Sequence, residues 1–151
     1  MAGPRHNGSI PGSDELSVIL TNRVDEPTRA RILQGLTADA LPGFGPPEPL
    51  AVLLRDAEDV LVGGMIGRTF WEWLVIELLW ITPSCRGAGH GRQLVTLAED
   101  EARRRGCHHA RVDTYTFQAP GFYEKCGYRR FAALDGFAHG QQRLSYAKPL
   151  V

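Results

Sequence analysis

Apolar runs recur along the chain between polar and glycine-rich stretches, and their spacing predicts alternating strands and helices. Residues 16–20 alternate weakly and are rich in branched side chains, which favours a strand. Asp25 can cap a helix over residues 26–39, with Pro27 in its first turn. Residues 41–49 hold four of the ten prolines and two glycines, which predicts a loop.

The middle of the chain predicts a hairpin, a long strand and an amphipathic helix. Residues 50–54 and 60–66 are apolar and flank a polar turn, as in an antiparallel hairpin. The apolar and aromatic run over 70–81 predicts one central strand that is covered on both faces. Apolar residues at helical spacing after residues 87–91 predict a helix that ends near Gly106, with Glu99 on its polar side.

The last third predicts a strand over 110–116, a short helix over 119–126, a strand over 128–134, a turn over 135–140 and a final strand over 143–148. One core and no internal repeat indicate a single α/β domain over residues 15–151. Residues 1–14 are rich in Gly, Pro, Ser and Asn, and we expect them to be disordered.

Charge and composition exclude several classes of protein. Lys plus Arg equals Asp plus Glu at 17 each, so no net charge holds a nucleic acid, and none is expected as a partner. No membrane-length apolar stretch and no secretory signal is present, which predicts a cytoplasmic protein without a membrane partner. Cys85, Cys107 and Cys126 suit neither a disulfide framework nor a metal cluster, so we expect free thiols and no metal.

A glycine-rich loop carries the strongest functional signal. Arg86-Gly87-Ala88-Gly89-His90-Gly91 lies between a buried strand and an amphipathic helix. Unpaired amides and the helix dipole stabilise phosphates at such a helix start, while glycines let a diphosphate approach the backbone. A purely structural turn is the alternative. The loop lacks the Gly-Lys-Ser/Thr ending of nucleoside triphosphate sites, and no early βαβ unit supports a dinucleotide.

Two motifs together resemble a known family. The six-residue loop matches the Arg/Gln-x-x-Gly-x-Gly/Ala signature of the GNAT family of N-acetyltransferases, at the same strand-to-helix junction. Residues 119–128, with the aromatic pair Phe122-Tyr123 before Gly127-Tyr128, resemble the later helix of that family. The resemblance implies a GNAT-like α/β fold, a mixed and mostly antiparallel sheet flanked by helices. The family often has two helices after the first strand, but here a single helix and the proline-rich loop over 41–49 occupy that place.

The resemblance implies acetyl-CoA as the acetyl donor. Its diphosphate would rest on the loop amides, its pantetheine arm would add to the edge of the long strand, and the amide near Ile81 would stabilise the oxyanion. The expected coenzyme-binding residues are Trp80, Ile81, Arg86, Gly87, Ala88, Gly89, His90, Gly91, Arg92 and Phe122.

By the same resemblance, a primary amine attacks the thioester directly in a ternary complex. Tyr123 aligns with the family tyrosine and is the expected acid for the departing thiolate; its alternative role is core packing. Glu77 is the only charge within residues 73–81 of the apolar run and is the expected base; a salt bridge, or a site that holds a cationic acceptor, is the alternative. Glu72 and Asp113 are reserve candidates for the base.

The acceptor is predicted only by class. Expected acceptor-binding residues are acidic or aromatic, although ordinary core packing explains many aromatic clusters: Glu72, Trp73, Asp113, Tyr115 and Phe117. A small amine such as an amino sugar, polyamine, amino acid or amine-bearing antibiotic is expected. A protein or peptide acceptor, or a non-catalytic acyl-CoA-binding module, is the alternative. Family members often dimerise, and the sequence leaves the choice between monomer and homodimer open.

Overall fold

The computed structural model describes residues 16–38 and 45–151. The chain forms two compact units, residues 1–43 and 44–151, which we describe separately. The segment predicted to be disordered, residues 1–14, lies outside the described residues, as do residues 41–44 of the predicted loop. A single domain over 15–151 therefore stays a prediction. In the described parts of the chain, no helix is long and apolar enough to cross a membrane.

The described part of the first unit contains one helix, α1 (Glu26–Thr37). Asp25 caps it as predicted, since its carboxylate accepts a 2.8 Å hydrogen bond from the Thr28 amide, and Pro27 lies in the first turn. No residue of α1 is buried. The predicted strand over residues 16–20 is wrong: this segment pairs with no strand among the described residues, and weak alternation of apolar residues does not by itself provide a hydrogen-bonding partner.

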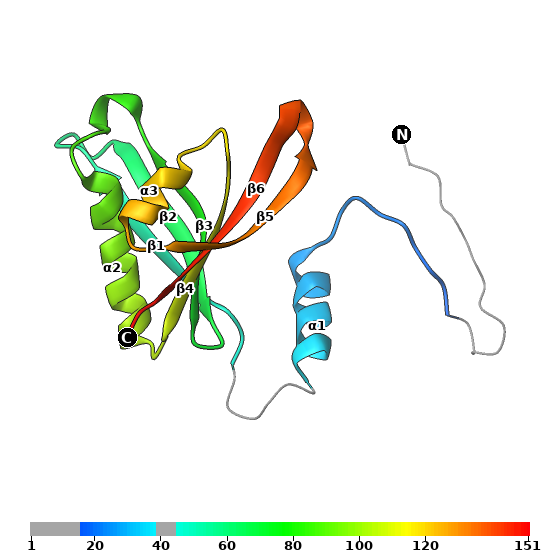
Figure 1. Ribbon diagram of the computed structural model, residues 1–151. Helices are drawn as coiled ribbons and strands as arrows, with labels where there is room; N and C mark the ends of the chain where they lie inside the picture. Colours follow the sequence, from blue (N-terminus) through cyan, green and yellow to red (C-terminus); the bar gives the residue numbers. More distant parts are fainter. Residues whose placement is uncertain (1–15, 39–44) are drawn as a thin grey trace. The chain divides into compact units, whose positions relative to one another are not determined.

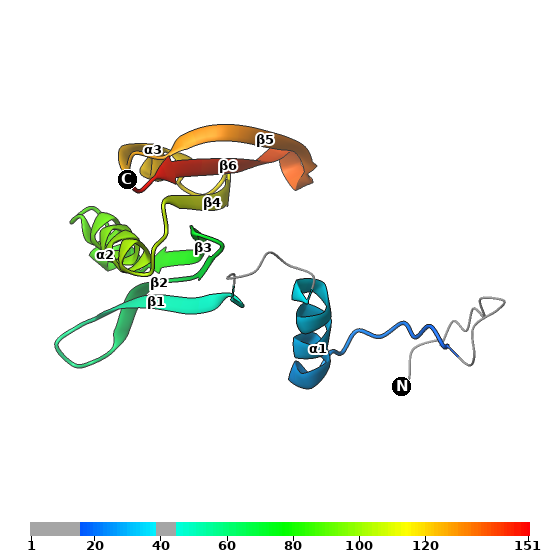
Figure 2. The same ribbon diagram turned by 90° about the horizontal axis from the view of Figure 1, so that it is seen from below.

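The second unit is built on a six-stranded sheet of order β1-β2-β3-β4-β6-β5 (Figures 1 and 2). Only β3 and β4 run parallel; the other neighbouring strands are antiparallel, so the mixed, mostly antiparallel α/β class is confirmed. The strands are β1 (Glu48–Arg55), β2 (Leu61–Phe70), β3 (Trp73–Ile81), β4 (His109–Tyr115), β5 (Arg129–Phe137) and β6 (Gln141–Pro149). The helices are η1 (Pro83–Cys85), α2 (His90–Arg104), α3 (Pro120–Lys125) and η2 (Ala138–Gly140).

The predicted single strand over 70–81 is wrong, because the chain turns back at Trp71 and Glu72. Phe70 pairs with Trp73, and the two residues between them have φ values of 48° and 63°. Positive φ at both central residues is the geometry of a tight two-residue hairpin turn, which is commonly built with Asn or Gly. Trp-Glu carries no such signal, so the apolar run concealed the turn.

The core lies between one face of the sheet and the helices. Helix α2 packs along β1, β2 and β3 (Figure 1). Within residues 45–151, no element covers the second face of β3 at Leu78 and Trp80, which are 64% and 51% exposed, so coverage of both faces is not met inside this unit. The larger buried apolar side chains are Leu50, Met65, Leu74, Ile76, Ile81, Leu94, Val95, Val112, Tyr123, Tyr128, Leu144, Tyr146 and Leu150.

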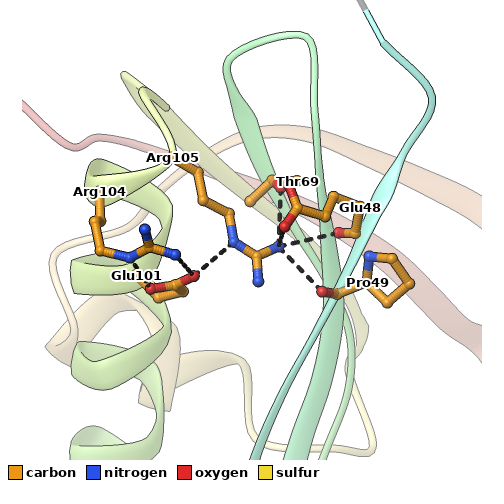
Figure 3. A network of polar contacts seen from close by, with 6 residues as sticks. All are labelled: Glu48, Pro49, Thr69, Glu101, Arg104 and Arg105. Carbon is orange, nitrogen blue, oxygen red and sulfur yellow. Dashed lines mark hydrogen bonds and ion pairs between the residues drawn. The ribbon is translucent and has the colours of Figure 1, made fainter.

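A polar network fixes the C-terminal end of α2 against the sheet (Figure 3). The Arg105 guanidinium donates to Glu101 on α2 at 2.7 Å, to the Pro49 carbonyl on β1 at 3.0 Å and to the Thr69 hydroxyl on β2 at 3.3 Å. Glu101 also accepts two hydrogen bonds from Arg104. One side chain therefore joins three elements at the end of the helix opposite the glycine-rich loop.

Candidate active site

A cleft opens where β3 and β4 stop pairing. The parallel pairing covers only Trp73–Ile76 and His109–Val112. Beyond these residues, β3 and β4 are not hydrogen-bonded to each other. Figure 2 shows β4, β6 and β5 diverging there from the β1–β3 half. A cleft of about 930 Å³ lies at this divergence and is lined by the ends of β3 and β4, by the glycine-rich loop and by α3. The sheet therefore offers a bare strand edge inside a concave site.

Glu77 marks the start of the cleft because it is the extra residue of a β-bulge. Ile66 pairs with Leu78 and Gly67 pairs with Ile76, so Glu77 has no partner on β2. A bulge shifts the facing of the residues that follow it. The buried positions accordingly change from Leu74 and Ile76 before the bulge to Ile81 after it.

The end of β3 presents backbone groups to the cleft. The Thr82 amide donates to the Val62 carbonyl of β2 at 2.8 Å, and successive amides of a strand point to opposite sides. The amides of Leu79 and Ile81 therefore point away from β2, toward the open edge. Arg86 confirms this direction, since its Nε reaches the Ile81 carbonyl from the cleft side at 2.9 Å.

The glycine-rich loop supplies a row of unused donors. The Arg86 amide donates a hydrogen bond to the Pro83 carbonyl. The next amide along the chain that donates a backbone hydrogen bond of good geometry is that of Gln93, which bonds to the Gly89 carbonyl. Within the described chain, none of the six amides from 87 to 92 donates a backbone or side-chain hydrogen bond of good geometry. They lie at the positive end of α2, which is 15 residues long, so an anion is stabilised there.

Glycine is required in this loop for two different reasons. Gly87 and Gly89 have φ values of 80° and 86°, which side chains rarely adopt, and the space where a Cβ would project is open. A Cβ on Gly91 would instead lie 3.0 Å from the Phe122 ring. Gly91 therefore allows α3 to approach the start of α2, and both elements line the same cleft.

Arg92 joins these two helices directly. Its Nη2 donates to the Lys125 carbonyl at 2.5 Å, near the end of α3. Arg92 and Arg86 are both exposed residues that line the cleft. The loop thus combines backbone amides with two guanidinium groups, which suits a diphosphate. His90 and Ala88 belong to the same loop, and Trp80 lies on the neighbouring strand end.

Tyr123 lies on α3 and lines the cleft, although it is only 7% exposed. Its ring packs edge-on against Phe122 at 5.1 Å and Tyr128 at 5.8 Å. Its hydroxyl makes no hydrogen bond to any residue that the structure describes. Burial, with a smaller contribution from Cys126, raises the pKa of Tyr123 to about 12. The sequence left open whether Tyr123 packs in the core or lies at the site, and in the structure it does both. Its phenol stays protonated near neutral pH because its pKa is raised.

A buried carboxylate supports the wall behind Tyr123. Glu99 is 3% exposed, so its expected place on the polar side of the helix is wrong. It accepts hydrogen bonds from the Tyr128 hydroxyl at 3.0 Å and from Lys148 at 2.8 Å. Charge pairing offsets the cost of burying both ions. The network joins α2 to β6 and to Tyr128, on which the Tyr123 ring packs.

The carboxylates of the cleft are paired with arginines. Glu77 lines the cleft, its side chain is 35% exposed, and it forms an ion pair with Arg68 of β2. Asp113 accepts from Arg143 and from the Ser145 hydroxyl, both at 2.6 Å. Burial alone would raise the pKa of Asp113, but these two hydrogen bonds, together with the positive charges of Arg143 and Arg111, outweigh burial and lower the pKa. Arg68 was not singled out in the sequence, although it is the only charged residue of β2.

The structure brings together only part of the predicted acceptor site. Tyr115 and Phe117 stack at 5.5 Å beside the cleft, and Asp113 lines it. Glu72 and Trp73 lie at the opposite end of β3, where the Glu72 carbonyl accepts from the His108 amide and Trp73 stacks on His109. Sequence reasoning missed Phe137, which falls inside the predicted turn over 135–140 but ends β5 in the structure, and which packs edge-on against Tyr115 at 5.1 Å.

Comparison with known proteins gives this geometry a family. The sequence model of the acetyltransferase (GNAT) family matches residues 21–128. The chain belongs to the GNAT family of acetyltransferases. This confirms the resemblance carried by the two motifs and the expectation of an acyltransferase that uses acetyl-CoA.

Two curated relatives differ in coverage. An acetyltransferase of Agrobacterium fabrum is 31% identical over 128 residues, which is 83% of this chain and 93% of the relative. Blasticidin-S acetyltransferase of Streptomyces morookaense is 44% identical over 81 residues, which is 53% of this chain and 60% of that enzyme. The second match therefore spans less than two thirds of the relative.

Solved structures share the fold over most of the chain. A crystal structure of an acetyltransferase from Agrobacterium tumefaciens has a TM-score of 0.78 and 29% identity, and the match covers 89% of this chain and 99% of that one. Nourseothricin acetyltransferase has a TM-score of 0.62 and 26% identity, with 70% and 67% covered. An aminoglycoside 6'-N-acetyltransferase in complex with coenzyme A, at 22% identity and a TM-score of 0.59, shares the fold.

Proposed function

We propose that this chain transfers the acetyl group of acetyl-CoA to a primary amine of a small molecule. One observation carries the proposal: the loop with the unused amides, the open edge of β3 and Tyr123 all line one cleft. Relatives named for acetylation of blasticidin-S and nourseothricin support a small amine-bearing acceptor, including an antibiotic.

The chain's own groups divide the work of binding. The amides of residues 87–92, with Arg86 and Arg92, hold the diphosphate. The open amides of Leu79 and Ile81 bind an extended arm in the manner of an added strand and polarise the thioester carbonyl. Phe122, packed on Gly91, forms the apolar side of this path. Acetyl-CoA supplies the activated acetyl group, and no covalent bond to the protein is required.

We assign Tyr123 the role of proton donor to the departing thiolate. A phenol with a pKa of about 12 remains protonated throughout the neutral range and can donate a hydrogen bond, then a proton, to a thiolate. Its hydroxyl makes no hydrogen bond within the described residues, so the donor capacity is available to the cleft.

Glu77 is assigned the proton acceptor for the attacking amine. It lines the cleft at the bulge, and Arg68 holds its carboxylate in position. Asp113 is the weaker candidate, because Arg143 and Ser145 already use both of its oxygens. A water between Glu77 and the amine fits the same role.

Release of free thiol from acetyl-CoA tests the proposal. The purified chain is incubated with a library of amino acids, polyamines, aminoglycosides, aromatic amines and short peptides, and products are identified by mass spectrometry. Acetylation of small amines is expected, with only background release on peptides. Preferential acetylation of peptides would favour a protein acceptor, and retained coenzyme binding without turnover would indicate a non-catalytic module.

A further inference from the structure

A second cavity adjoins the cleft at the ends of β4 and of the β5–β6 hairpin. It has a volume of about 430 Å³ and is mostly apolar. Its lining, which we call the aromatic pocket, consists of Tyr115, Phe117, Phe137, Ala138, His139 and Gln141. Phe117 also lines the cleft that holds Tyr123, so the two cavities adjoin at this residue.

The rings of the aromatic pocket present flat surfaces. Tyr115 and Phe117 stack with their planes at 18°, while Phe137 meets Tyr115 edge-on at 78°. Phe117 is 67% exposed, so its ring is accessible to a ligand. A planar ring can stack on such a face and meet a ring edge at the same time, whereas a puckered ring cannot do both.

The backbone around the aromatic pocket is held in place. The Thr116 hydroxyl accepts from the Gln142 amide at 3.0 Å and donates to Gln141 at 2.6 Å. His139 has a left-handed φ of 57°, a conformation that is uncommon outside glycine and recurs at functional sites. The walls are therefore preorganised, which reduces the entropy cost of binding a ligand.

The charge balance argues against a polycationic acceptor. Both carboxylates in the adjoining cleft are neutralised, Glu77 by Arg68 and Asp113 by Arg143. No carboxylate lines the aromatic pocket within the described residues. A polyamine or an aminoglycoside would thus meet little uncompensated negative charge here.

We propose that the aromatic pocket binds a planar ring of the acceptor, so that the substrate is an amine attached to an aromatic or heteroaromatic ring. The ring stacks on the face of the exposed Phe117 that Tyr115 does not cover, and the amine extends past Phe117 toward Tyr123 and Glu77. This assignment rests on the proposed acetyl transfer and narrows its substrate class.

Three amines test the assignment in the thiol-release assay: phenethylamine, cyclohexylethylamine and spermidine. The first two have the same chain and similar apolar bulk but differ in ring planarity. We expect KM for phenethylamine to be roughly threefold to tenfold lower than for cyclohexylethylamine, and turnover of spermidine to be slow. Equal KM values for the two rings, or a preference for spermidine, would overturn the assignment while leaving acetyl transfer intact.

Replacement of Phe137 by Leu, which keeps apolar bulk but removes the ring, should erase the preference for the planar amine. Phe131→Leu is the matched control, since Phe131 lies on the same hairpin, is 63% exposed and does not line the aromatic pocket. Calorimetric titration with coenzyme A should give equal affinities for both variants. A preference unchanged in Phe137→Leu contradicts the assignment. If no amine turns over, calorimetry of phenethylamine binding to the coenzyme-loaded protein separates loss of chemistry from absence of the ring site.

Discussion

Replacement of Tyr123 by Phe should separate catalysis from stability. The change removes one oxygen atom and leaves the ring contacts with Phe122 and Tyr128 in place. The hydroxyl has no hydrogen-bond partner among the described residues, so no buried group loses its partner. We therefore expect the free energy of unfolding to change by less than about 1 kcal/mol.

Turnover should respond far more strongly. Removal of a general acid typically costs roughly a hundredfold or more in rate, which corresponds to about 2.7 kcal/mol of transition-state stabilisation. Coenzyme affinity should stay within about twofold, because the loop amides that bind the diphosphate are untouched. Steady-state kinetics, calorimetry with coenzyme A and denaturant unfolding measure the three quantities on one preparation.

The pH dependence gives a further check on Tyr123. Its folded-state pKa is raised from 10.0 to about 12, so the protonated form is favoured by folding. The associated stabilisation is complete below pH 10 and is lost as the pH rises toward 12. The Tyr123→Phe variant should therefore lose less stability than the wild type between pH 10 and pH 12.

The control for Tyr123 is Tyr146→Phe, whose hydroxyl donates to Glu124 at 3.1 Å and which does not line the cleft. Turnover of the control should remain near that of the wild type. Unchanged turnover in Tyr123→Phe, or a loss of several kcal/mol in its stability, would refute the assignment.

Two further predictions concern the polar networks. Glu99→Ala leaves Lys148 and Tyr128 without their buried acceptor, and we expect a loss of about 3 kcal/mol in denaturant unfolding; a loss below 1 kcal/mol would mean that the network does little for the fold. Hydrogen bonds from Arg104 and then Arg105 lower the pKa of Glu101 from 4.5 to about 2, so its stabilisation is present above pH 4.5 and disappears as the pH falls toward 2. Glu101→Gln should unfold in acid with a shallower pH dependence, and an identical acid transition would contradict this.

Local signals were sufficient for much of the fold. The cap at Asp25, the hairpin between residues 50 and 66, the glycine loop and the helix after it carry their conformations in nearby residues. The turn at Trp71 and Glu72 could not be predicted in this way, because neither residue type favours positive φ.

The site was predictable where it depends on backbone and less so where it depends on pairing. The loop glycines and Tyr123 were identified from motif and position, and the structure brings them to one cleft. The partners of Glu77 and Asp113 were not, because Arg68 and Arg143 come from other strands whose register the sequence does not state. The burial of Glu99 was missed for the same reason, since its partners Tyr128 and Lys148 are distant in sequence.

Titration of the protein with coenzyme A, monitored by calorimetry, tests the diphosphate site most directly. Gly89→Val should weaken binding roughly tenfold to a hundredfold, because the side chain enters the open space above the loop amides. Gly106→Val is the matched control, since Gly106 has a similar φ of 82° and equally open surroundings at the other end of α2, and so bears the same backbone strain. Tight binding by the wild type and the control, but not by Gly89→Val, is the predicted result; no binding by the wild type, or equal affinity in Gly89→Val, would contradict it.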